Sequence, residues 1–105
     1  MTYGRRLNVY SAVADLRVQL RSAGATTWAD RLEVASQRGA TSGEILGDLA
    51  LELESMIASR DRTTTDSVSM ACVVLHAINR AFLATGQPAR ALPAQCAHVT
   101  LPDAE

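Results

Sequence analysis

Two cysteines and two histidines are the residues of this chain whose types could support metal or nucleophilic chemistry. Cys72 and His76 are four residues apart, so a helix would place them on one side, and Cys96 and His98 could add two ligands from the C-terminal segment. Four such ligands would make a tetrahedral zinc site. The chain lacks the CxxC and HxxxH spacings of common zinc sites. We therefore expect no metal site and no cofactor, with zinc binding kept as an alternative.

The same cysteines are poor candidates for a disulfide or a nucleophile. They are far apart in the sequence and do not form a disulfide framework. Cys72 falls in an apolar helical run, which indicates a small buried core residue in a reducing compartment. A reactive thiolate needs an electropositive, partly exposed setting, and no carboxylate can be placed beside Ser69 and His76 to complete a triad. We expect no catalytic residues and no enzymatic activity.

Three carboxylates form the one charge pattern that favours recognition. Glu44, Asp48 and Glu52 repeat every four residues and would form an acidic ridge along a helix. They lack the Glu-x-x-His element of carboxylate-bridged metal bundles. A solvated outer face explains such a ridge most simply. The alternative is partner binding, because an acidic ridge complements a basic surface such as the phosphate-binding cleft of a nuclease.

The overall charge argues against nucleic acid as a partner. The chain has ten basic residues, all of them arginine, and eleven acidic residues, for a net charge of −1. Six arginines lie in the first 38 residues: Arg5, Arg6, Arg17, Arg21, Arg31 and Arg38. The second and third expected helices loosely resemble a helix-turn-helix, but the recognition helix would be the acidic one, which repels phosphate. These arginines are expected to pair with acidic side chains.

Apolar residues recur at helical spacing in four segments, and no strand alternation of useful length is present. The pattern predicts helices over about 7–22, 28–37, 43–59 and 66–85. Thr41 with Glu44 is a capping-box pattern, and Thr27 with Asp30 resembles one with a shorter acid. The fold class is therefore all-α, a single-domain antiparallel bundle of about four helices.

The chain divides into a helical bundle over residues 1–86 and a proline-containing, irregular tail over residues 87–105. The helix at 66–85 is apolar nearly all round, so it is either the central helix or one whose outer side meets a partner, such as a second copy. A membrane span would have to bury His76, Asn79 and Arg80, so none is expected. No apolar run follows the first arginines, so no signal peptide is indicated and a cytoplasmic location is expected.

Residues 20–32 (LRSAGATTWADRL) and 39–49 (GATSGEILGDL) resemble small all-helical bacterial proteins, some of which are immunity proteins of polymorphic toxins. The resemblance lies within residues 20–49 and includes no diagnostic functional motif, so no site residue is transferred from it. It implies a protein-interaction module, most concretely an inhibitor that binds and neutralises a toxin domain. The alternative is a structural homodimer or a regulatory adaptor without enzymatic activity.

Overall fold

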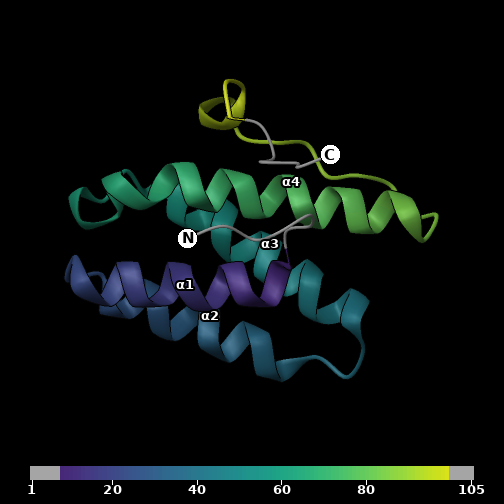
Figure 1. Cartoon of the computed structure of the whole chain (residues 1–105), viewed down its shortest axis with the longest axis horizontal. Coiled ribbons are helices and arrows are strands. Elements are labelled where there is room, and N and C mark those ends of the chain that lie inside the picture. The colour runs from purple at the N-terminus through teal and green to yellow at the C-terminus, as the bar shows by residue number, and fades with distance from the viewer. Residues whose placement is uncertain (1–7, 100–105) are drawn as a thin grey trace.

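Residues 8–99 are described by a computed structural model, in which they form four α-helices and two short 3₁₀ turns. The elements are α1 (Val9–Ser22), α2 (Thr26–Arg38), α3 (Ser42–Ser59), η1 (Arg62–Ser67), α4 (Val68–Ala84) and η2 (Ala94–Cys96). Successive helices run in opposite directions and pack on one another, and α4 closes the bundle against α1 (Figure 1). The predicted all-α, single-domain bundle is confirmed, and the described range contains no strand.

Each helix turns one apolar stripe toward a shared core, as the sequence spacing predicts. The largest fully buried side chains include Leu16, Leu20, Leu32, Leu49, Leu53, Met56, Leu75 and Ile78. Trp28 is half-buried and packs against this cluster from α2. The burial of these side chains is the main favourable contribution to the folding free energy, because a short helix such as α2 is marginal by itself.

The connection between α1 and α2 is tighter than the sequence indicates, and α2 begins two residues earlier than predicted. Gly24 adopts a φ of +87°, and the Ala25 N–H donates to the Leu20 carbonyl at 2.8 Å. The turn at Gly24 therefore both ends α1 at Ser22 and lets α2 begin at Thr26. The N-cap is Ala25, without a side-chain cap, so the predicted cap by Thr27 and Asp30 is wrong. Thr27 already lies within the helix.

The start of α3 confirms the other predicted capping box. The Thr41 hydroxyl oxygen accepts a hydrogen bond from the Glu44 N–H at 3.2 Å. The Glu44 carboxylate in turn accepts from the Ala40 N–H at 2.8 Å, one residue before the N-cap. Side chains therefore satisfy the Glu44 N–H, which the start of a helix leaves without a backbone partner, and the Ala40 N–H just before the helix.

Replacing Thr41 with alanine is expected to lower the free energy of unfolding by about 1 kcal/mol, because the Glu44 N–H loses its acceptor. Urea denaturation followed by circular dichroism measures the change. The matched control is Ser42→Ala, one residue further on at the first helical position, which should change stability much less. Equal losses for both variants would contradict a capping role for Thr41.

The entry into α4 differs from the prediction of a helix that begins at residue 66. Arg60 ends α3 with a φ of 54°, in the left-handed region. The Asp61 carboxylate then caps η1 by accepting from the Thr63 N–H at 2.9 Å. The buried Thr64 donates its hydroxyl to the Asp61 carbonyl at 2.8 Å. The predicted helix start at residue 66 is therefore wrong, since η1 precedes α4, which begins at Val68.

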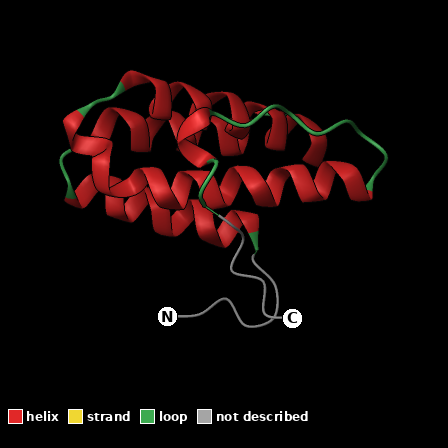
Figure 2. Cartoon of the chain, turned by 90° about the horizontal axis from the view of Figure 1, so that it is seen from above, coloured by secondary structure: helices red, strands yellow, loops and turns green. Residues whose placement is uncertain are grey.

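Residues 87–99, named the strap from here on, run back along the outer side of α4 (Figures 1 and 2). Leu92 and Val99 pack against the core, and Cys96 in η2 is fully buried. The inner side of α4 packs against α1 and α3. Much of the second apolar side of α4 is thus covered by the same chain. Residues 100–105 of the predicted tail lie outside the described range.

Within the described residues, one stretch is long and apolar enough to cross a membrane by length and composition alone. It spans residues 62–84, with a mean hydropathy of 1.5, and 44% of the apolar window is buried inside the fold. The core helix of a water-exposed bundle meets the same criteria. The stretch is therefore weak support for a membrane span.

Candidate functional site

The three predicted partner-binding residues lie along the side of α3 next to α2. Glu44 is exposed, and Asp48 and Glu52 are half-buried. We define the α2–α3 face as the surface made by Arg31, Val34 and Arg38 of α2 with Glu44, Asp48, Leu51 and Glu52 of α3. The two helices run antiparallel through a turn of three residues, 39–41, which fixes which side chains meet.

Arginines of α2 neutralise two of these carboxylates. The Nε atom of Arg31 lies 2.7 Å from Oε1 of Glu52, and that of Arg38 lies 3.5 Å from Oδ2 of Asp48. Glu44 is occupied by the α3 cap. The acidic ridge is therefore a row of oriented, internally partnered carboxylates. Sequence spacing placed them on one face but contained no information about their partners.

The expected pairing of arginines with acidic side chains is confirmed for the described part of the chain's first 38 residues. Between α1 and α2, the ion pairs are Arg17–Glu33 at 3.2 Å, Arg21–Asp30 at 2.9 Å and Arg21–Glu33 at 3.1 Å. These pairs are partly exposed, so each stabilises the fold by about 1 kcal/mol at most. Arg5 and Arg6 lie outside the described residues.

Arg31 is held on two sides. Its guanidinium carbon lies 4.3 Å from the centroid of the Trp28 ring, while its Nε contacts Glu52. A stacked, ion-paired guanidinium loses little conformational freedom when a partner binds. Tryptophan and arginine are also the residue types that most often dominate binding energy at protein interfaces.

Apolar side chains are exposed beside these charged pairs. Val34 is 53% exposed and Leu51 is 51% exposed. A shallow cleft of about 380 Å³ on this face is lined by Thr27, Asp30, Arg31, Val34, Arg38 and Glu52. Exposed aliphatic groups surrounded by ordered charges resemble the composition of a small protein-binding patch.

Asp61, between α3 and η1, is a carboxylate near Trp28. Asp61 accepts hydrogen bonds from the backbone N–H and the hydroxyl of Thr63, at 2.9 and 2.7 Å. These bonds lower the pKa of Asp61 below its ordinary value, and the nearby Trp28 side chain lowers it further. All of these donors favour the ionised carboxylate.

We expect the stability contribution of this carboxylate to depend on pH. Because its pKa is lowered in the folded state, the contribution is present above the unfolded pKa of about 4 and is lost as the pH falls through the folded value. Asp61→Asn should therefore be less stable than the wild type near neutral pH, and the two curves should converge in acid. Urea unfolding of both proteins across this range measures the difference. If the difference in unfolding free energy between the two proteins instead grows as the pH falls, the Asp61 carboxylate is not its source.

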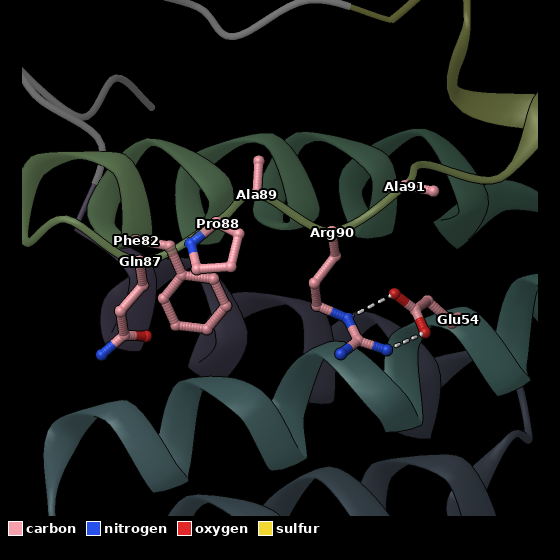
Figure 3. A pocket seen from close by; sticks show the side chains of 7 residues that line it. All are labelled: Glu54, Phe82, Gln87, Pro88, Ala89, Arg90 and Ala91. Atoms are coloured by element: carbon pink, nitrogen blue, oxygen red, sulfur yellow. Dashed lines mark hydrogen bonds and ion pairs between the residues drawn. The ribbon is translucent and has the colours of Figure 1, made fainter.

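A second cleft, of about 770 Å³, lies under the strap and is lined by Glu54, Phe82 and residues 87–91 (Figure 3). Arg90 reaches from the strap to α3, where its Nε and Nη2 atoms each lie 2.8 Å from a Glu54 oxygen. These bonds raise the pKa of Arg90 above its ordinary value. No sequence pattern distinguishes Glu54 or Arg90 from the other charged residues. The polar Asn79 within an apolar helix was the one available signal, since a partly buried amide needs partners.

The expectation for the cysteines is wrong, because they form a disulfide. Cys72 of α4 and Cys96 of η2 are bonded, with Cα atoms 5.2 Å apart and both residues fully buried. Their separation of 24 residues does not reveal that the tail folds back onto α4. With both sulfurs oxidised, neither is a thiolate nucleophile, and the alternative zinc site loses two of its four ligands.

The remaining members of that zinc alternative do not gather elsewhere. His98 is exposed on the strap and His76 is half-buried on α4. Among residues 8–99, no group of three or more His, Cys, Asp or Glu side chains is placed to hold a metal ion.

Comparisons of the chain with protein-family models, with curated proteins and with solved structures find no match. Two surfaces of this fold are candidate binding sites. One is the α2–α3 face, where the sequence predicted a site. The other is the strap-covered groove between α3 and α4.

Proposed function

We propose that this chain is a protein-interaction module that binds its partner through the α2–α3 face. The observation that carries the proposal is the exposure of Val34 and Leu51 beside ordered ion pairs. Burying these two side chains would contribute favourable free energy, and the fixed charges around them would set the orientation of the partner. No residue of the face is assigned a catalytic role.

The more specific form of the proposal is an immunity-type inhibitor that neutralises a toxin domain. It rests on the resemblance of residues 20–49 to such proteins and on the charge of the face. Three carboxylates, of Glu44, Asp48 and Glu52, stand against the two guanidinium groups of Arg31 and Arg38. A surface with this acidic excess complements a toxin whose active-site region is basic.

Binding and inhibition of a toxin domain encoded beside this chain's gene test the proposal. Co-purification followed by a toxin activity assay should show a complex and protection. Val34→Asp should weaken the complex about tenfold or more, because a charge would enter its apolar centre. The matched control is Val18→Asp on α1, where the wild-type side chain is 66% exposed and lies off the face. A stable complex that both variants leave unchanged would exclude the face.

The contribution of the acidic ridge (Glu44, Asp48 and Glu52) to partner binding can be measured separately from its role in the ion pairs of the fold. Reversing Glu52 alone would also break its ion pair with Arg31. The double exchange Arg31→Glu with Glu52→Arg keeps an opposite-charge pair and moves the carboxylate to α2. Affinity for a basic partner should fall while the unfolding midpoint stays close to that of the wild type. Unchanged affinity would show that this carboxylate does not contact the partner.

The homodimer alternative was based on the second apolar side of α4, which could have packed against a second copy of the chain. The strap covers much of that side, with Leu92 and Val99 packed against the core and Cys96 bonded to Cys72. The main uncovered apolar side chain at the end of α4 is Leu83, which is 64% exposed. This arrangement favours the interaction module. Sedimentation that shows dimers at micromolar concentration would favour the homodimer instead.

The proposed cytoplasmic location rests on the sequence pattern alone. Disulfides persist in oxidising compartments and are rare where cellular thiols are kept reduced. The Cys72–Cys96 bond therefore makes the compartment testable. Alkylation of free thiols during denaturing lysis of the cells, which exposes the two buried positions, should label both cysteines if the protein resides in the cytoplasm. Complete protection from alkylation would assign it to an oxidising compartment.

A further inference from the structure

The strap lies in the groove between α3 and α4 as an extended peptide would lie in a binding site. The chain reverses at Gly86, whose φ is +83°, and residues 87–93 then run without helix or strand along α4 (Figure 2). The backbone hydrogen bonds within the strap lie at its far end, around η2, where the Cys96 N–H donates to the Pro93 carbonyl at 2.9 Å. The bundle contacts the strap at four positions along its length: Pro88, Arg90, Leu92 and Cys96.

Asn79 of α4 binds the backbone of the strap. Its Nδ2 donates to the Arg90 carbonyl at 2.9 Å, and its Oδ1 accepts from the Arg90 N–H at 2.9 Å. One amide side chain thus satisfies both polar groups of a single peptide residue, as a neighbouring β-strand would. This recognition requires an extended segment but does not depend on its side chain.

Glu54 of α3 supplies the selectivity at the same residue. Its two oxygens accept from Nε and Nη2 of Arg90, both at 2.8 Å, in a bidentate pair (Figure 3). Lysine could not reproduce two parallel bonds of this geometry. The groove therefore binds an extended backbone and selects arginine at one position.

Apolar positions flank that arginine on both sides. Pro88 lies beside Phe82 at one end of the cleft (Figure 3), and Leu92 packs against the core at the other. The segment that the groove accommodates has the pattern Pro-x-Arg-x-Leu, with proline favouring the extended backbone.

The disulfide fastens the far end of the strap. Cys96 is joined to Cys72 six residues beyond Arg90. A covalent tether holds the segment near its groove at an effective concentration on the order of millimolar or above, which a peptide in solution would have to exceed. A dithiol reductant, itself oxidised to a disulfide, supplies two electrons and two protons that convert the bond to two thiols. Because the bond is buried, the end of the strap must lift for this exchange to occur.

We propose that the α3–α4 groove is a binding site for an extended, arginine-containing segment of a partner protein, and that the strap occupies this site in cis while the Cys72–Cys96 disulfide is closed. Reduction frees the far end, and the partner segment then competes with residues 88–92 for Asn79 and Glu54. This site is separate from the α2–α3 face and does not depend on the function proposed for it.

A labelled peptide with the strap sequence 86–93 (GQPARALP) tests the proposal by fluorescence anisotropy. We expect saturable binding to the full-length Arg90→Ala variant under reducing conditions, because its own strap has lost the Glu54 contact. Oxidised wild type should bind about tenfold more weakly or not at all. The matched control, Arg62→Ala under the same reductant, should behave as the reduced wild type, since Arg62 in η1 is not part of the cleft lining.

Two further changes test the chemistry of recognition. Adding Glu54→Gln to the Arg90→Ala background should weaken peptide binding about tenfold or more, and so should arginine-to-lysine replacement in the peptide. Circular dichroism verifies that each variant keeps its helices. Absence of saturable binding to a folded, reduced Arg90→Ala variant would overturn the proposal, as would equal affinity for a peptide whose arginine is replaced by alanine.

Hydrogen exchange on the wild type gives a second measurement that needs no substitution. On reduction, the backbone amides of residues 90–92 and 94–96 should exchange faster, while those of α1 and α2 stay protected. An unchanged strap would contradict control by the disulfide. If reduction instead produces a concentration-dependent dimer that Glu54→Gln abolishes, the occupant is the strap of a second copy, and the proposal of a partner protein is wrong.

Discussion

Replacing both cysteines with alanine is expected to lower the free energy of unfolding by about 3 kcal/mol, a large part of the stability of a domain this size. The bond between Cys72 and Cys96 closes a loop with a sequence separation of 24. Without it, the unfolded chain gains conformational entropy, and the strap is held to α4 by non-covalent contacts alone. Alanine is preferred to serine because both positions are fully buried, where a hydroxyl would lack a partner.

Urea denaturation of the wild type, with and without a dithiol reductant, measures this contribution independently. The reductant should shift the wild-type midpoint in the same direction as the double substitution. It should leave the midpoint of the Cys72→Ala, Cys96→Ala protein unchanged, which is the control for other effects of the reagent. A reductant effect on the double variant, or none on the wild type, would contradict a stabilising disulfide.

The helices were predictable because local sequence determines them. Apolar spacing located all four, and the Thr41–Glu44 pattern placed the start of α3 within one residue. Where the prediction was wrong, a tertiary constraint prevailed. Gly24 turns the chain so sharply that α2 starts before Thr27, its expected cap. The tail was expected to be irregular, and although its apolar Leu92 and Val99 could dock onto the bundle, its local sequence does not show that it returns along α4.

The sites were harder to predict than the helices because they depend on the alignment of separate elements. Glu44, Asp48 and Glu52 share a face by spacing alone, but their partners on α2 follow from the antiparallel register. Arg90 bonds to Asn79, which is 11 positions away in the sequence, and to Glu54, which is 36 positions away. The disulfide has the same origin, since Cys96 reaches Cys72 only after the strap folds back.

Leu53→Ala is expected to destabilise the bundle by about 2 to 5 kcal/mol, and Leu51→Ala by no more than about 0.5 kcal/mol. Both leucines belong to α3, two residues apart. Leu53 is fully buried among the helices, whereas Leu51 is 51% exposed on the α2–α3 face. Removing the Leu53 side chain leaves a cavity that the packed core fills only in part, while water already reaches Leu51.

The Leu53→Ala and Leu51→Ala variants also distinguish an effect on stability from an effect on partner binding. Thermal and urea unfolding should show the large loss for Leu53→Ala alone. Affinity for the partner should fall for Leu51→Ala, although its unfolding midpoint stays near that of the wild type. Similar stability losses for the two variants would mean that α3 does not present this side to water and that the α2–α3 face is not a free surface. Because both substitutions remove the same atoms from one helix, helix propensity cannot account for a difference between them.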